Sequence, residues 1–200
     1  MPNLATLLRA YESLADGWVR VDQATVDGQK IHLFFSLVRG RRGRVVDRYV
    51  VLADGTREVC LRDFNGGGLR VYPSNHPAAK QYVDVKQRSQ VSGVGDSPHS
   101  IVGALLDAHT RAVDDWIPFD RYLGAADLLV DRLASTRSWR FSAPRFLSRI
   151  YARVLKDLGI RVNVLSSPGA RSSTRLRVLH FGESYIVAED FKSQRVASAG

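Results

Sequence analysis

The clearest pattern in this sequence lies at residues 145–158, which read RFLSRIYARVLKDL. At about 100° per residue, the large apolar side chains of this stretch fall on one broad helical face. They are Phe146, Leu147, Ile150, Tyr151, Val154, Leu155 and Leu158. The pattern predicts an amphipathic helix from Ser142 to the residue before Gly159, packed on a core through its apolar side.

The opposite face of the same predicted helix is cationic. Arg145, Arg149, Arg153 and Lys156 fall within about 80° of one another and form a ridge about 16 Å long at the helical rise. Like charges at this spacing destabilise a helix by a few tenths of a kcal/mol per pair. A phosphate backbone that neutralises the ridge would remove this penalty, so the pattern indicates a nucleic-acid-binding surface.

The surrounding sequence shares this positive charge. Residues 132–177 contain eleven Lys and Arg residues and a single acid, Asp157, although the net charge of the whole chain is only +9. The remainder of the chain is therefore close to neutral. Such a concentrated basic block indicates a surface that meets a polyanion.

Two further segments, Ile160–Leu165 and Arg175–Phe181, have strand-like composition and flank a loop rich in Ser, Pro and Gly. We expect them to form a hairpin whose cations contact the nucleic-acid backbone. These cations are Arg171, Arg175 and Arg177, and Arg161 on the first strand is a further predicted nucleic-acid-binding residue. Three helices followed by a hairpin with a basic tip resemble a winged helix-turn-helix arrangement, in which the last helix enters the major groove.

Elsewhere the periodicity predicts a helix over 4–15, a helix that starts at Ser97-Pro98, and a helix over 120–134. Strand-like segments lie between the first two helices, and Asp27-Gly28 and Asp54-Gly55 provide tight-turn signals there. These segments are 18–26, 29–39, 45–53, 56–64, 69–72 and 82–85, and a strand is also expected at 185–188. We therefore expect an antiparallel sheet over roughly 18–90.

The predicted fold class is α+β. An N-terminal antiparallel sheet module preceded by a helix (1–90) is followed by a linker (91–97). A three-helix module that ends in a β-hairpin and is winged-helix-like completes the chain (98–200).

A second basic cluster sits in a glycine-containing turn and comprises Arg39, Arg41, Arg42 and Arg44. An arginine loop of this kind reaches a phosphate or a groove in some proteins and is a solvated hairpin tip in others. Both readings are open for this cluster.

One alternative assigns catalysis to the sheet module. Glu12 on the first helix, Asp63 at a strand end and the triplet Asp84-Val85-Lys86 resemble the skeleton of the PD-(D/E)xK nucleases. That resemblance implies Asp63 and Asp84 as Mg²⁺ ligands and Lys86 as the group that orients the attacking water. No Pro precedes Asp63, which departs from the pattern of that family.

Several classes of protein are disfavoured by what the sequence lacks. A single cysteine, Cys60, excludes an internal disulfide framework and Cys-cluster zinc sites. The sequence shows no long apolar run and no basic-then-apolar leader, so we expect no membrane partner and a cytoplasmic protein. Phosphate-loop, HExxH and GxSxG motifs are also missing from the sequence.

The sequence thus predicts a DNA-binding or other nucleic-acid-binding protein, without catalysis or a cofactor, that favours DNA over RNA. A Mg²⁺-dependent nuclease is one alternative. A subunit of a larger assembly, such as a phage particle, is the other, and it predicts self-association.

Overall fold

The computed structural model describes residues 4–40, 42–62, 65–93, 97–136, 138–166 and 175–196. The chain forms two compact units. Unit 1 comprises residues 1–79 and 174–200, and unit 2 comprises residues 80–173. Unit 2 is therefore an insertion between two parts of unit 1, and the first division falls within the short helix α2 (Pro77–Val83).

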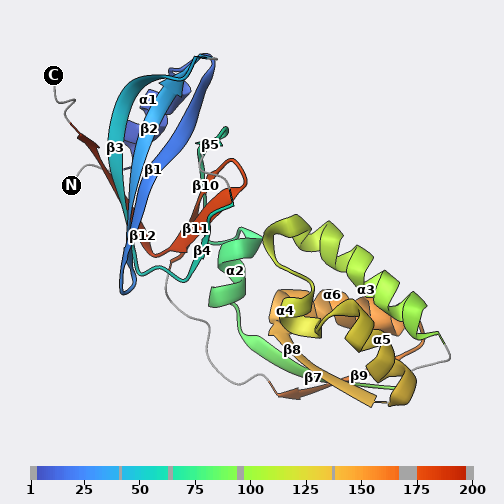
Figure 1. The fold of residues 1–200 in the computed structure, drawn as a ribbon. Helices are drawn as coiled ribbons and strands as arrows, with labels where there is room; N and C mark the ends of the chain where they lie inside the picture. Colours follow the sequence, from blue (N-terminus) through green and yellow to red (C-terminus); the bar gives the residue numbers. More distant parts are fainter. Residues whose placement is uncertain are drawn as a thin grey trace. The chain divides into compact units, whose positions relative to one another are not determined.

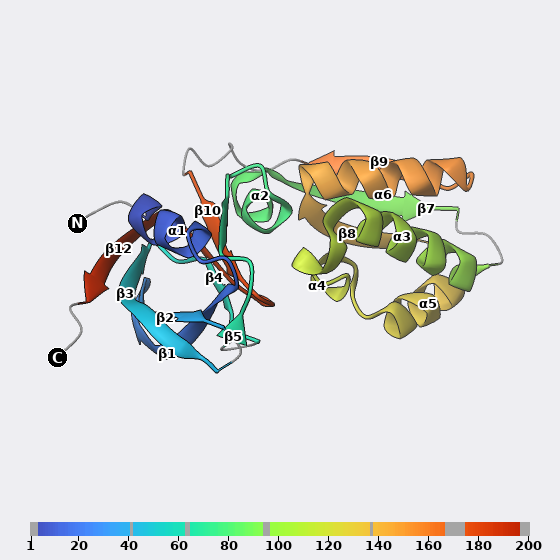
Figure 2. The ribbon, with the colours of Figure 1, turned by 90° about the horizontal axis from the view of Figure 1, so that it is seen from above.

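Unit 1 is built from two antiparallel sheets. The larger has the order β12-β3-β2-β1-β5, and its strands are β1 (Gly17–Asp27), β2 (Lys30–Arg39), β3 (Arg44–Asp54), β5 (Asn65–Gly66) and β12 (Asp190–Val196). The smaller has the order β4-β11-β10-β6, and its strands are β4 (Glu58–Cys60), β6 (Arg70–Tyr72), β10 (Arg177–Phe181) and β11 (Ser184–Ala188). In Figure 2 these strands curve around a common interior, with α1 (Ala5–Glu12) beside them.

The core of unit 1 follows from strand alternation. In β2, Ile31, Leu33, Phe35 and Leu37 occupy alternate positions and are all buried. Phe35 packs edge-on against Phe181 of β10, with ring centroids 5.1 Å apart. The larger sheet therefore buries its apolar face against residues from both ends of the chain, which holds the C-terminal strands on the N-terminal sheet.

Unit 2 places helices on one side of a three-stranded antiparallel sheet, as Figure 1 shows. The sheet order is β8-β7-β9, with strands β7 (Lys86–Ser92), β8 (Ser138–Pro144) and β9 (Arg161–Ser166). The helices are α3 (Pro98–Val113), α4 (Asp120–Leu123), α5 (Ala126–Ser135) and α6 (Arg145–Asp157), and a short 3₁₀ turn η1 (Asp114–Trp116) follows α3. One face of the sheet is covered by this helical layer, while its other face carries polar residues.

The amphipathic helix predicted around residues 145–158 is confirmed as α6. Leu147, Tyr151 and Leu155 are fully buried, and they pack with Trp139 and Phe141 of β8 in a single core cluster. The helix at Ser97-Pro98 is also confirmed, with Pro98 in its first turn. The predicted fold class holds at the level of a mixed α+β protein with antiparallel sheets.

The predicted hairpin after α6 is wrong. β9 pairs with β7, where Val162 lies opposite Val91, and it belongs to unit 2. β10 instead pairs with β6 and β11 in unit 1. The two strands separate because their apolar residues join different cores: Val162 packs in unit 2, whereas Leu179 and Phe181 pack in unit 1.

The structure also divides the chain differently from the predicted modules 1–90 and 98–200. Val91 and Ser92, placed in a linker by the sequence, belong to β7, where Val91 is fully buried. The strand expected at 82–85 is wrong because Tyr82 and Val83 end α2. The helix expected over 120–134 is interrupted at Gly124, whose φ of 84° separates α4 from α5.

A close backbone approach in unit 1 depends on two glycines. A Cβ added to Gly182 would lie 2.6 Å from the Cα of Gly66, and Gly182 also has a φ of +59°. Gly28, in the β1–β2 turn, has a similar φ of +57° but no atom within 4 Å of an added Cβ. The two positions therefore differ in crowding while sharing the same backbone conformation.

We predict that Gly28→Ala lowers the free energy of unfolding of unit 1 by about 1–2 kcal/mol, the usual penalty of a left-handed alanine. Gly182→Ala should lower it by about 1–3 kcal/mol more, because the methyl group meets backbone that has no room to move. Amide hydrogen exchange of β10 and β11 measures both effects. Equal effects of the two substitutions would contradict the close approach.

A buried histidine joins α3 to α6 in unit 2. His109 Nδ1 lies 2.6 Å from Tyr151 Oη, and its Nε2 lies 2.6 Å from the carbonyl oxygen of Ile117. A carbonyl only accepts, so Nε2 carries the proton and the tyrosine hydroxyl donates to Nδ1. Burial lowers the pKa of His109 below its usual value of 6.5 and raises the pKa of Tyr151.

The lowered pKa means that protonation of His109 favours the unfolded state. Neutral His109 contributes fully to the stability of unit 2 above pH 6.5, the ordinary pKa of histidine. This contribution is lost as the pH falls below 6.5. We predict that the unfolding free energy of unit 2 falls as the pH is lowered through and below 6.5.

This pH dependence is measurable by urea denaturation in a Trp18→Phe background, where Trp116 and Trp139 both report on unit 2. In that background, His109→Gln should lower stability at neutral pH but abolish most of the pH dependence. An unchanged pH dependence in the His109→Gln variant would exclude His109 as its source.

Candidate nucleic-acid interface

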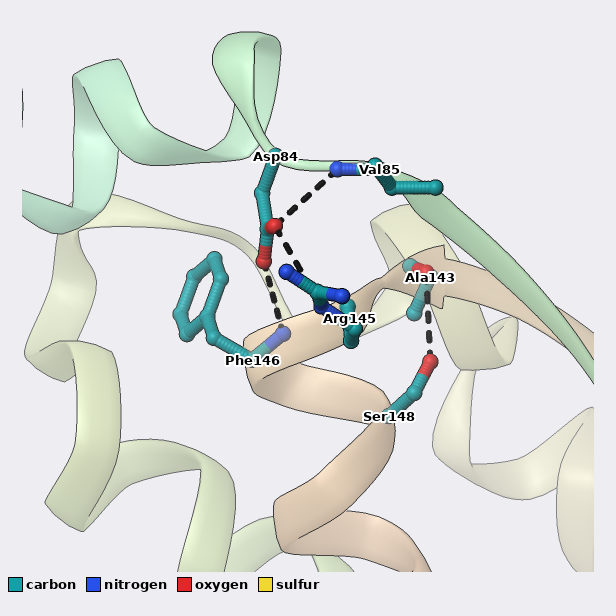
Figure 3. A network of polar contacts seen from close by, with 6 residues as sticks. All are labelled: Asp84, Val85, Ala143, Arg145, Phe146 and Ser148. Carbon is teal, nitrogen blue, oxygen red and sulfur yellow. Dashed lines mark hydrogen bonds and ion pairs between the residues drawn. The ribbon is translucent and has the colours of Figure 1, made fainter. Parts of the chain in front are cut away.

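The start of α6 is fixed by a carboxylate from outside the helix. Asp84, which follows α2, accepts a hydrogen bond from the backbone N–H of Phe146 through Oδ2 at 2.8 Å. Its Oδ1 accepts from the N–H of Val85 at 3.0 Å, as Figure 3 shows. The side chain of Asp84 is only 6% exposed, so a buried anion satisfies the first turn of the helix and complements its dipole.

Arg145 belongs to this same network. Its Nε lies 3.9 Å from Oδ1 of Asp84, and its side chain is one-third exposed. The backbone N–H of Arg145 also donates to the carbonyl of Val85 at 2.8 Å. Asp84 thus partly neutralises the first cation of the predicted ridge.

The remaining ridge residues, Arg149, Arg153 and Lys156, are exposed on the side of α6 away from its buried residues. Among the residues that the structure describes, no carboxylate lies within ion-pair distance of these three side chains. They span about 10 Å along the helix axis. The three form a basic ridge whose charge is not neutralised by any described acid.

A shallow groove of about 410 Å³ continues the basic surface from α6 onto β9. Lys156 lines it from the helix, and Arg161 and Asn163 line it from the strand. Arg161, one of the predicted nucleic-acid-binding residues, is exposed, and it lies in the same unit as α6. The ridge and β9 therefore form one cationic surface of unit 2.

Other predicted contacts do not share this surface. Arg175 and Arg177 belong to unit 1, and Arg177 forms an ion pair with Asp190 of β12. Arg171 lies outside the described residues. The dense charge seen in the sequence at 132–177 is thus divided between two units by the chain's return to unit 1.

The second basic cluster is a hairpin tip. Arg39 and Arg44 face each other at the ends of β2 and β3, and Arg42 lies in the turn between them. All three side chains are exposed, and Gly40 and Gly43 adopt φ values of 69° that close the turn. Arg41 lies outside the described residues.

The structure also exposes basic residues that were not among the individually predicted contacts. Arg88 of β7 and Arg140 of β8 are exposed, and Lys86, named only in the nuclease alternative, is exposed at the start of β7. The signal was present as alternation: in β8, Trp139, Phe141 and Ala143 are buried while Ser138, Arg140 and Ser142 are exposed. The prediction of a helix from Ser142 obscured it.

The predicted metal-binding set is not assembled by the described residues. Asp63 lies outside them, and Asp84 caps α6, while Lys86 points to the solvent side of a strand. The described part of the chain contains no group of three or more His, Cys, Asp or Glu side chains placed to hold a metal ion.

No model of a protein family, no curated protein and no solved structure gives a significant match to this chain. In the described ranges, no helix is both long enough and apolar enough to cross a membrane.

We predict that Asp84→Ala lowers the free energy of unfolding of unit 2 by about 1–3 kcal/mol, because it leaves the partly buried N–H of Phe146 without its acceptor. Asp84→Asn should lower it less, since an amide oxygen still accepts. Urea denaturation in the Trp18→Phe background measures both changes.

Asp157, an exposed acid at the C-terminal end of α6, provides the matched control. Its charge opposes the helix dipole there, so Asp157→Ala should leave stability unchanged or slightly raised. If Asp84→Ala were as harmless as Asp157→Ala, Asp84 would not cap the helix.

Proposed function

We propose that this protein binds nucleic acid, with DNA favoured over RNA, through the basic surface of unit 2. The observation that carries the proposal is the ridge of Arg149, Arg153 and Lys156, which is exposed and lacks a described acidic partner. Each strand of B-DNA presents one phosphate per 3.4 Å of helix axis, so a ridge of about 10 Å matches about three of them.

The rigidity of the ridge supports this proposal. Leu147, Tyr151 and Leu155 anchor α6 in the core, and Asp84 fixes its first turn. The backbone of the three cations is therefore fixed by a helix that packs on the core, and not carried by a loop. A preorganised set of cations loses less conformational freedom when it binds phosphates.

The preference for DNA rests on the kind of surface that unit 2 offers. The major groove of B-DNA admits a helix or strands, whereas the major groove of A-form RNA is too narrow for side chains to read. The winged-helix-like arrangement is not part of the proposal, because the strand that follows α6 pairs with β7 and forms no wing. The nuclease alternative is not carried forward, because the carboxylate of Asp84 is already engaged at α6.

The salt dependence of binding tests the proposal. With Arg149, Arg153, Lys156 and Arg161 on phosphates, the log–log slope of affinity against salt for duplex DNA should be about −3.6. Replacing Arg149, Arg153 and Lys156 by Gln should reduce the magnitude of this slope by about 2.7 and weaken binding by on the order of ten-fold or more. Fluorescence anisotropy with a labelled duplex at several salt concentrations gives both quantities.

A control variant distinguishes the effect of the unit 2 basic surface from the effect of a lower net charge. Replacing Arg57, Arg111 and Arg195 by Gln removes three cations that are each paired with an acid, so the net charge falls by the same amount. The control should keep most of the affinity and the slope. Equal losses in the two triple variants, or no binding of wild type to DNA, would refute the proposal.

A further inference from the structure

The face of the unit 2 sheet that points away from the helices is formed by alternate residues of its three strands. In β7, Gln87, Ser89 and Val91 are buried, which leaves the side chains between them on the other face. In β8 the same alternation buries Trp139, Phe141 and Ala143. The open face, defined by strand register, carries Lys86, Arg88, Gln90, Ser92, Ser138, Arg140, Ser142, Arg161 and Asn163.

Strand pairing arranges these side chains in rows. Gln90 lies opposite Arg140 on one side and Asn163 on the other, which places two amides and a guanidinium side by side. Ser92 lies opposite Ser138 and Arg161 in the next row. Neighbours in a row lie about 5 Å apart at Cβ, and successive rows lie about 7 Å apart along the strands.

The charged residues of this face are all positive. Its three strands contain four cations, Lys86, Arg88, Arg140 and Arg161, and no Asp or Glu. All four are exposed, and none of them is within ion-pair distance of a carboxylate in the described part of the chain. The face therefore complements an anionic partner.

The uncharged residues between the cations have the chemistry of base readers. Arg pairs in bidentate fashion with guanine, and Asn and Gln with adenine, in the major groove of B-DNA. Serine hydroxyls donate or accept at either kind of base edge. The central row of this face contains Asn163, Gln90 and Arg140, so the Asn, Gln and Arg side chains that pair with adenine and guanine lie side by side.

The width of the sheet is close to that of the major groove of B-DNA. Three strands place their outer axes about 10 Å apart, and the major groove of B-DNA is about 12 Å wide. Asn163 belongs to the open face and also lines the groove that Lys156 borders, so this face meets the basic surface of α6 at β9. The open sheet face can therefore contact base edges while the adjoining basic surface of α6 contacts the flanking phosphates.

Single-stranded nucleic acid fits this face poorly. Binding of unpaired bases relies on stacking against aromatic rings. The aromatic residues of β8, Trp139 and Phe141, pack in the core with ring centroids 5.0 Å apart, and the open face has no aromatic residue. The face offers hydrogen-bonding groups in place of stacking platforms.

We propose that the open face of the β8-β7-β9 sheet enters the major groove of duplex DNA and reads base edges through Gln90, Arg140 and Asn163. This inference deepens the proposed function, since it requires DNA as the partner. The inference goes beyond the proposed function because it assigns sequence preference to the sheet. The α6 ridge, in contrast, contacts phosphates at any sequence.

The test begins with selection of a duplex DNA library that has a randomised central segment. Wild-type protein should enrich a sequence, and should bind an enriched duplex on the order of ten-fold or more tighter than a shuffled one. The neutral double variant Gln90→Ala, Asn163→Ala should lose most of this discrimination while its salt slope stays unchanged. The α6 triple Gln variant should weaken binding to both duplexes and keep their ratio.

Gln23→Ala, Gln194→Ala provides the matched control, since both are exposed strand amides of unit 1. It should leave the ratio of affinities unchanged, and the thermal unfolding of both double variants should match wild type. The inference fails if wild type enriches no sequence, if the Gln90/Asn163 variant discriminates as wild type does, or if single-stranded DNA or RNA binds more tightly than duplex DNA. Absence of DNA binding by wild type would also refute the proposed function, and tighter binding of RNA than of DNA would refute its preference for DNA. The remaining outcomes leave the proposed function standing.

Discussion

The hydrogen bond from the backbone of Phe146 to the carboxylate of Asp84 fixes the geometry of unit 2. Asp84 lies two residues before β7, so one buried anion connects the central strand of the sheet to the first turn of α6. This contact holds the helix on the sheet with its apolar residues inward. The exposed positions of Arg149 and Arg153 follow from that orientation, because they lie across the helix from Tyr151.

Charge in unit 2 is segregated by element. Most of its acids lie along the segment from α3 to α5, and Asp107 there is paired with Arg111 one helical turn later. The sheet strands carry cations and polar residues, and α6 carries one acid at its end. A fold that keeps its acids away from one surface gives that surface a positive potential, which attracts and orients a polyanion. The proposed ridge and sheet face both depend on this separation.

The sequence was most informative where a single periodicity ran for several turns. The α6 pattern predicted the helix, its buried side and its exposed cations, and the structure agrees for Leu147, Arg149 and Arg153. Prediction failed where partners are distant in sequence. Val162 pairs with Val91 rather than with a strand that follows it, and no local signal shows which core an apolar strand will join.

The local elements and their polarity can be derived from the order of residues along the chain, because side-chain alternation and helical periodicity are properties of neighbouring residues. Which of these elements lie together depends on contacts between residues far apart in the chain, and these are seen only in the folded protein. Arg161 lies beside α6 in unit 2, whereas Arg177, sixteen residues later, belongs to unit 1. One face of the β8-β7-β9 sheet stays open, since the apolar residues of β7 and β8, Val91, Trp139, Phe141 and Ala143, are buried against the helices on the other face.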